Sequence, residues 1–217
     1  SNNLIMNLYS VAIGHKYEVE ADRLKRSMSP LKVTVLTERD VERKREDNLI
    51  NGLYHKSNFA NYIEEAEGPV VFQDADMFTL SDDPLKDFKV KEDTEFAYVP
   101  YEGTWHLPDE IRQSAFDYHG HKINSGFMYF KNLEVAQKIC NQWRHEYLER
   151  EKLYDVYKGT SKYEYDEWAL MIALQKLGDI KIELLDSKWN DWSLNLGDEV
   201  LDNESVFFQS HNHMDIV

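Results

Sequence analysis

The first third of the chain alternates between two hydrophobic patterns, and this alternation limits the possible folds more than any other feature. Short apolar or β-branched runs at 8–13, 31–37 and 69–73 predict strands. Between them, apolar residues recur at helical spacing over 17–28 and again over 59–66. An order of strand, helix, strand, helix, strand predicts a parallel sheet covered by helices, because each crossover must return the chain to the same edge of the sheet.

The rest of the chain predicts further strands and helices in a less regular order. We expect strands at 95–99, 126–130, 180–185 and 206–209, and helices at 133–150 and 166–177. A polar and aromatic insertion spans 100–123, and long insertions of this kind often carry function. No repeat, linker or low-complexity segment divides the sequence. The prediction is one α/β domain over residues 1–217, with a mostly parallel central sheet flanked by helices.

Composition narrows the classes of function. The chain has 25 Lys and Arg against 40 Asp and Glu, which gives a formal net charge of −15. Nucleic-acid affinity comes mainly from neutralising phosphates, so this charge argues against non-specific polyanion binding and suits a cation requirement. A single cysteine, Cys140, excludes an internal disulfide framework, and no apolar run approaches the roughly 18 residues that cross a bilayer. We therefore expect a cytoplasmic protein without a membrane span.

Two carboxylates, Asp74 and Asp76, come directly after the expected buried strand that ends at Gln73. Ligands of open α/β sheets bind beyond the carboxyl ends of parallel strands. If the backbone stays extended there, both carboxylates point to one side and can hold a hard divalent cation, which can in turn neutralise a diphosphate. A solvated acidic turn is the alternative, because a bare Asp-x-Asp is a weak motif.

Three further patterns follow the Asp-Ala-Asp segment in a particular order. They are Asn-Ser-Gly-Phe-Met-Tyr-Phe at 124–130, Asp-Glu-Trp at 166–168, and Lys-Trp-Asn at 188–190 followed by His211 after the last expected strand. In this order they resemble the GT-A nucleotide-sugar glycosyltransferases, in particular the glycogenin and bacterial galactosyltransferase type. The opening Ala-Ile-Gly-His-Lys-Tyr at 12–17 resembles that family's first strand and turn. The resemblance extends from about residue 9 to residue 213 and implies a single GT-A, Rossmann-like domain.

The resemblance also implies roles for individual residues. Asp74, Asp76 and His211 would hold Mn²⁺ or Mg²⁺. The donor would be a nucleoside-diphosphate sugar, with uridine diphosphate as the first choice of carrier. Gly14, Tyr17 and Thr37 would surround the nucleoside, and Lys56 would contact sugar or phosphate. Asn124, Ser125 and Gly126 would lie beside the sugar. Asp166 and Glu167 match an Asp-Gln pair at the reacting face of the sugar. The resemblance implies a retaining enzyme. Glu167 departs from the family's pattern, and a carboxylate there can act as a base or stabilise a cationic carbon.

Several of these residues have ordinary structural explanations. Tyr17 lies on the apolar stripe of an expected helix, Gly14 suits a strand-to-helix turn, and Asn124 to Gly126 suit a turn before a strand. Asp166 and Glu167 are also acidic residues at a helix N-terminus, where the macrodipole favours them. His211 and His213 are both close enough to the last expected strand for either to be the metal ligand.

The same residues leave more than one function open. We expect a metal-dependent hexosyltransferase-like enzyme that moves a sugar from its donor to a hydroxyl acceptor, which the sequence leaves undefined as a glycan, small molecule, protein or modified nucleic-acid base. Paired carboxylates also serve nucleotidyltransferases and phosphohydrolases, although the loop around Gly14 is short and poor in glycine for a nucleotidyltransferase. A non-catalytic carbohydrate-binding relative is the third possibility. The sequence does not indicate the oligomeric state.

Overall fold

The fold centres on a mixed sheet with helices on both faces. The computed structural model describes residues 5–101, 121–152, 165–197, 201–211 and 213–216, so most of the expected insertion at 100–123 lies outside the described residues. The sheet comprises β1 (Asn7–Val11), β2 (Val33–Leu36), β3 (Val70–Gln73), β5 (Phe96–Tyr101), β6 (Lys122–Phe130) and β7 (Ile182–Leu184), in the order β2-β1-β3-β6-β5-β7. Parallel pairing joins β1 to β2, β1 to β3 and β5 to β7, whereas β6 is antiparallel to β3 and β5. The predicted α/β class with a mostly parallel sheet is confirmed.

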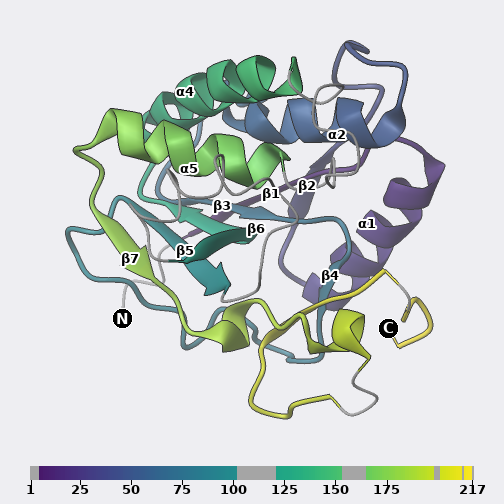
Figure 1. The fold of residues 1–217 in the computed structure, drawn as a ribbon. Helices are drawn as coiled ribbons and strands as arrows, with labels where there is room; N and C mark the ends of the chain where they lie inside the picture. The colour runs from purple at the N-terminus through teal and green to yellow at the C-terminus, as the bar shows by residue number, and fades with distance from the viewer. Residues whose placement is uncertain (1–4, 102–120, 153–164, 198–200, 212, 217) are drawn as a thin grey trace.

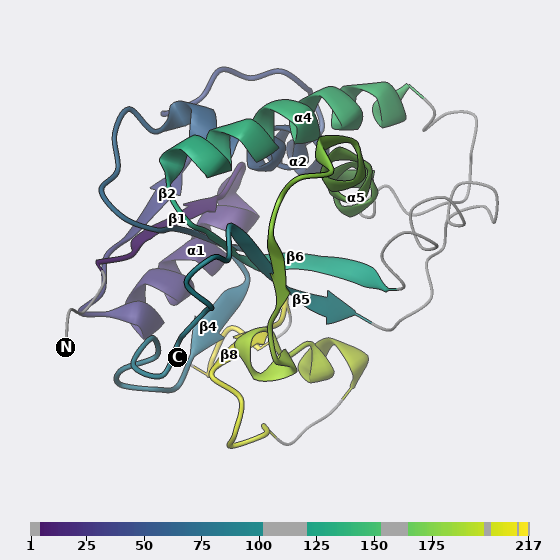
Figure 2. The same cartoon turned by 90° about the vertical axis from the view of Figure 1, so that its left-hand side faces the viewer.

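The helices are distributed over the two faces of the sheet (Figures 1 and 2). The α-helices are α1 (His15–Met28), α2 (Asn48–Ser57), α4 (Leu133–Glu151) and α5 (Tyr165–Leu177), and short 3-10 helices are η1 (Phe59–Tyr62), η3 (Ser187–Trp189) and η4 (Ser193–Leu196). Helices α2, α4 and α5 cover one face, and α1 lies on the other. Among the described residues, no helix combines the length and the apolar character needed to cross a membrane.

Alternate residues of each strand pack into two different hydrophobic cores. Phe72 of β3 packs with the residues of α4 and α5, whereas its neighbour Val71 packs with Leu24 and Met28 of α1. In strand β6, Met128 and Phe130 pack in the first core, and Phe127 and Tyr129 pack in the second. This two-residue period explains why the central strands are continuously hydrophobic in sequence, since both of their faces are buried.

The prediction of an α-helix over 59–66 is wrong. Apolar residues at helical spacing over 59–66 predicted a helix, but the α-helix α2 occupies Asn48–Ser57 and is followed by the 3-10 helix η1. Asp47 caps α2 by accepting a hydrogen bond from the backbone N–H of Ile50, a start signal that helices commonly use. Helix α2 was missed because it buries polar side chains, among them His55 and Lys56, so its inner face does not look hydrophobic in sequence.

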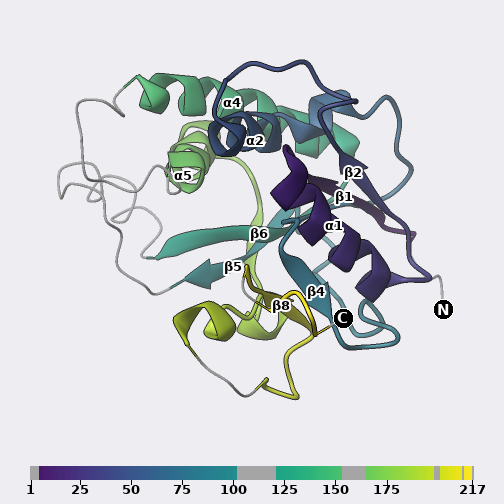
Figure 3. The ribbon, with the colours of Figure 1, turned by 90° about the vertical axis from the view of Figure 1, so that its right-hand side faces the viewer.

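The structure contains a second, two-stranded sheet, of which the sequence predicted only the strand at 206–209. Strand β4 (Met77–Thr79) follows the Asp-Ala-Asp segment directly and pairs antiparallel with β8 (Phe207–Gln209), and Met77 lies opposite Gln209. Figure 3 shows this small sheet beside α1. The pairing carries the end of the chain back to the residues that follow β3, which positions His211 near Asp76.

Candidate active site

A cavity of about 640 Å³ opens where β1 and β3 end. This is the carboxyl edge of the parallel strands, where ligands of open α/β sheets are expected. Because β6 runs in the opposite direction, its first residues lie at the same edge as the end of β3. Eight of the residues predicted from sequence line this cavity: Tyr17, Lys56, Asp74, Asp76, Asn124, Asp166, Glu167 and His211.

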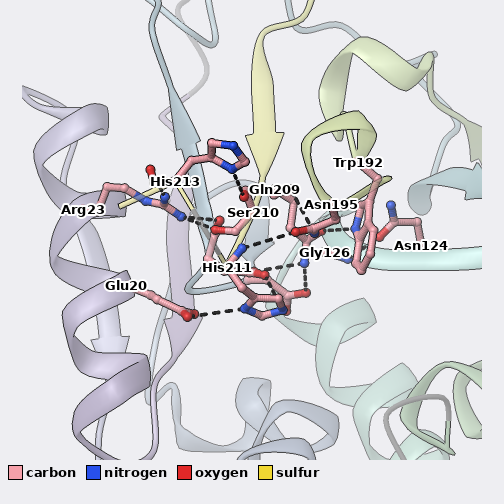
Figure 4. A network of polar contacts seen from close by, with 12 residues as sticks. Glu20, Arg23, Asn124, Gly126, Trp192, Asn195, Gln209, Ser210, His211 and His213 are labelled. Carbon is pink, nitrogen blue, oxygen red and sulfur yellow. Dashed lines mark hydrogen bonds and ion pairs between the residues drawn. The ribbon is translucent and has the colours of Figure 1, made fainter. Parts of the chain in front are cut away.

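Asp74 and Asp76 share one partner, the side-chain amide of Gln209. Gln209 Nε2 donates to Asp74 Oδ2 at 2.9 Å and to Asp76 Oδ1 at 3.0 Å. The amide oxygen of Gln209 accepts from the indole N–H of Trp192 at 2.8 Å, which fixes the orientation of the amide (Figure 4). The two carboxylates therefore face a common side of the cavity, as the extended spacing predicts.

Asp76 meets His211 and Glu20 on one side of the cavity. His211 Nε2 lies 3.1 Å from Asp76 Oδ2. His211 Nδ1 lies 3.4 Å from Glu20 Oε1, a contact that Figure 4 shows. Asp76 and Glu20 are buried, and both Asp76 Oδ2 and Glu20 Oε2 lack a hydrogen bond within the described residues. One ligand atom from each of the three residues lies within 4.8 Å of the others, a spacing that can accommodate a metal ion.

Positive charge on this side comes from Arg23 and only partly balances two buried acids, Asp76 and Glu20. Burial, with the neighbouring charge of Asp74, raises the pKa of Asp76 to about 7. The hydrogen bond to Glu20 and the charge of Asp76 raise the pKa of His211, although burial acts in the opposite direction. A divalent cation would supply the missing charge.

Arg23 connects α1 to both segments that carry this group. Its guanidinium donates to the backbone carbonyls of Asp76 at 2.7 Å, Ser210 at 2.7 Å and His213 at 2.8 Å. Arg23 is fully buried, so these bonds form away from water. The turn after β3 and the segment after β8 are therefore held to the same helix.

The opposite side of the cavity is built around Lys56 of α2. Lys56 Nζ lies 2.8 Å from Asp74 Oδ1 and 3.3 Å from Asp166 Oδ2, and it donates to Ser125 Oγ at 2.8 Å. Burial alone would lower the pKa of Lys56, but the carboxylates of Asp74 and Asp166 outweigh it and raise the pKa above its ordinary value. Lys56 is thus a permanently charged link between the Asp-Ala-Asp segment and α5.

Glu167 lies next to this link and faces the cavity from the first turn of α5. Glu167 Oε2 is 3.3 Å from Lys122 Nζ, and Glu167 Oε1 accepts from the backbone N–H and the hydroxyl of Ser125, each at 3.3 Å. Burial raises the pKa of Glu167 to about 7, Lys122 acts in the opposite direction, and Asp166 adds to the rise. Burial also raises the pKa of Asp166, against the influence of Lys56. Both acidic residues are helix N-terminal and cavity-lining at once.

Asn124, Ser125 and Gly126 belong to strand β6 rather than to a turn before it. The pairing of β5 with β6 shifts register between Tyr98 and Val99, so this part of β6 is bulged. Gly126 accepts a hydrogen bond from the backbone N–H of Asp74 at 2.8 Å. A Cβ at Gly126 would lie 2.3 Å from Gln209 Oε1, so this glycine permits the approach of the bridging amide.

The three residues expected around the nucleoside have different surroundings. Tyr17 lines the cavity from α1 and also packs against Ala12 and Ala21. Gly14 has a φ of 94°, and a Cβ there would lie 2.5 Å from Asn48 Nδ2, so its place in the strand-to-helix turn requires glycine. Thr37 is not among the lining residues; its backbone N–H and hydroxyl both donate to Asp40 Oδ2.

The two histidines after β8 differ in direction. His211 reaches Asp76, whereas the His213 ring contacts Ser210 Oγ at 2.7 Å through Nδ1. The family resemblance assigned the metal to His211, and the sequence left His213 as the alternative. The sequence analysis also missed Glu20, Arg23 and Gln209. Glu20 and Arg23 lie on the buried, otherwise apolar side of α1, and charged residues in that position were the only signal of their role.

Comparisons with known proteins agree on the fold. No protein-family model and no curated protein matches the chain. Among solved structures, mouse xyloside xylosyltransferase 1 in its apo form is similar with a TM-score of 0.51 and 12% identity, over 98% of this chain and 100% of that chain. The galactosyltransferase LgtC in complex with donor and acceptor sugar analogues is similar with a TM-score of 0.56 and 14% identity, over 94% of this chain and 86% of that chain.

An active-site mutant of LgtC, in which a glutamine is replaced by glutamate, is similar with a TM-score of 0.54 and 14% identity over 94% of this chain and 86% of that chain. All three neighbours are glycosyltransferases, and each is matched over nearly its whole length. The chain therefore has the GT-A glycosyltransferase fold, as its motifs predict.

Proposed function

We propose that this protein is a metal-dependent glycosyltransferase that moves a sugar from a nucleoside-diphosphate sugar, with uridine diphosphate as its carrier, to a hydroxyl group of an acceptor. The observation that carries the proposal is the convergence of Asp74, Asp76 and His211 on one cavity at the carboxyl edge of the sheet. The GT-A fold supports it, and so does the donor complex of the neighbour LgtC.

The residues present fit a divalent cation. Asp76 Oδ2 is buried without a hydrogen bond within the described residues, and an imidazole nitrogen lies 3.1 Å away. Two carboxylates and one imidazole form a donor set that suits Mn²⁺ better than Mg²⁺, which prefers oxygen ligands and keeps its waters. Asp74, Asp76 and His211 would hold the cation, which when bound neutralises charge that develops on the departing diphosphate.

In the transfer step, the bond between the anomeric carbon and the diphosphate oxygen breaks, and its electron pair goes to the diphosphate. Asp166 and Glu167 face the cavity and stabilise positive charge on the anomeric carbon. The acceptor oxygen forms the new bond on the face from which the diphosphate departs, so the anomeric configuration is retained. The proton of the acceptor passes to a diphosphate oxygen on that face. Lys56 holds Asp74 and Asp166 in place throughout.

The first experiment is an assay of nucleoside-diphosphate release from a panel of nucleotide sugars, with Mn²⁺ and with EDTA. Release that requires Mn²⁺ and is lost in Asp76→Asn supports the proposal. Pyrophosphate release from a nucleoside triphosphate would point instead to a nucleotidyltransferase. Absence of turnover and of donor binding with every sugar would indicate a non-catalytic protein.

A second experiment tests the stereochemistry. Once a donor and an acceptor are found, the anomeric configuration of the product can be read by NMR spectroscopy. Retention is expected, and inversion would mean that Glu167 acts as a base toward the acceptor from the opposite face.

A further inference from the structure

We propose that Glu20 is a positioning residue for the metal site, which holds the ring of His211 so that Nε2, and not Nδ1, faces the cation. This inference rests on the proposed metal dependence and goes beyond it, because Glu20 lies on α1, outside all the motifs of the sequence. Glu20 sits one turn before Arg23, the residue that ties α1 to the backbone around Asp76 and Ser210.

The orientation of the imidazole carries the argument. Nδ1 of His211 faces Glu20 Oε1 at 3.4 Å, and Nε2 faces Asp76 Oδ2 at 3.1 Å (Figure 4). A cation shared by Asp76 and His211 must therefore be bound through Nε2. Metal-ligating histidines commonly donate their other ring N–H to a carboxylate, which fixes the tautomer and makes the ligand nitrogen more basic. Glu20 is the carboxylate in that place.

Burial shows that Glu20 is not an ordinary surface acid. Its side chain is 3% exposed, its Oε2 has no hydrogen bond within the described residues, and His211 is 44% exposed. A buried carboxylate is costly unless a charged or donating group faces it. His211 provides the donor, and the nearby guanidinium of Arg23 provides compensating charge. The contact with Glu20 helps to set which ring nitrogen of the half-exposed imidazole faces Asp76.

Two substitutions at Glu20 separate positioning from direct ligation. Glu20→Gln keeps an oxygen that can accept from Nδ1 but removes the charge, whereas Glu20→Ala removes the acceptor. If Glu20 positions His211, we expect the Mn²⁺ dissociation constant to rise by at least about tenfold in Glu20→Ala and to be largely restored in Glu20→Gln. Mn²⁺ alone is titrated, and the free ion is measured by electron paramagnetic resonance. Asp22→Asn, on the exposed side of the same helix, is the matched control and should bind Mn²⁺ as the wild type does.

The tautomer gives a readout that a merely structural role would not change. In ¹⁵N-histidine-labelled protein saturated with diamagnetic Zn²⁺, a ring nitrogen that binds the ion carries no proton, so NMR spectroscopy distinguishes Nδ1–H from Nε2–H, and His211→Gln identifies the signal. We expect Nδ1–H in the wild type and in Glu20→Gln, and a shift toward Nε2–H in Glu20→Ala.

Three results would overturn the inference. They are Nε2–H in the wild type, unchanged Mn²⁺ affinity in Glu20→Ala, or equal losses in Glu20→Gln and Glu20→Ala, the last of which would make Glu20 a direct ligand. Failure of the proposed function is seen separately, because wild-type protein would then show no Mn²⁺-dependent release of nucleoside diphosphate while the Mn²⁺ titration and the tautomer could still be measured.

Discussion

Two aspartates separated by a single residue occupy opposite electrostatic environments. Asp74 faces Lys56, a buried ammonium group at 2.8 Å, and is balanced by it. Asp76 faces His211 and the second buried acid Glu20, and one of its oxygens has no hydrogen bond within the described residues. Gln209 touches both carboxylates and joins the two sides.

The two carboxylates of one Asp-x-Asp motif therefore differ in their electrostatic surroundings. The Asp74 side has its permanent cation in the protein, so it is organised before any ligand arrives. The Asp76 side has two buried acids, Asp76 and Glu20, near the guanidinium of Arg23, which donates to backbone carbonyls, so the charge of the two acids is only partly balanced. Substitutions on the two sides should therefore have different effects.

Lys56→Met should destabilise the protein by about 3–5 kcal/mol, because it leaves Asp74 and Asp166 beside each other without their buried counter-charge. Urea unfolding monitored by circular dichroism measures the change. Lys138→Met breaks an exposed pair with Asp179 and should change the free energy of unfolding by less than about 0.5 kcal/mol. Equal effects of the two substitutions would remove the basis of the comparison.

Asp74→Asn and Asp76→Asn should act in opposite directions in metal-free protein. The first weakens the ion pair of Lys56 and should lower the free energy of unfolding by about 2 kcal/mol. The second removes a buried charge that lacks a full partner and should raise it by about 1 kcal/mol. Denaturant titrations in EDTA at pH 8 measure both. Destabilisation by both, to the same extent, would mean that the two sides are alike.

Glu167 should make metal-free stability depend on pH. Its pKa is raised from 4.5 to about 7 in the folded protein, so the folded state keeps a proton that the unfolded chain releases, and stability is lost as the pH rises from about 4.5 to about 7. Glu167→Gln lacks this titration. Its free energy of unfolding, relative to that of the wild type, should therefore rise by about 2 kcal/mol as the pH goes from 5 to 8. The exposed Glu64→Gln is the control and should follow the wild-type curve. A Glu167→Gln curve parallel to wild type would contradict the raised pKa.

Trp192→Phe should have the smallest effect, because it keeps an aromatic ring and removes only the N–H that orients Gln209. The loss of one such hydrogen bond costs about 1 kcal/mol, so Mn²⁺ affinity should fall by about fivefold. Isothermal titration calorimetry with Mn²⁺ measures this. Unchanged affinity would show that Gln209 joins the two sides without help from the indole.

By itself, the sequence was sufficient to predict most of the fold. The strands around Val71 and Met128 are buried on both faces, so their hydrophobic runs are visible without any knowledge of their partners. Asp74 and Asp76 could be predicted at the edge of the sheet because they directly follow such a run. Helix α2 could not be predicted, because a helix that buries Lys56 toward a polar cavity has no hydrophobic stripe there.

The balance of charges in the site depends on contacts between distant parts of the chain. The two aspartates meet residues from three separate elements. Lys56 is 18 positions from Asp74, Glu20 is 56 positions from Asp76, and Gln209 is more than 130 positions from both. Local patterns indicate which face of an element is apolar, but they do not indicate which charged side chains will face each other across a cavity. That depends on the antiparallel pairing of β4 with β8 and on α1 and α2, which line the cavity from opposite faces of the sheet. The sequence determined where the carboxylates stand in the chain; the fold decided that one is neutralised by a lysine and the other faces a histidine.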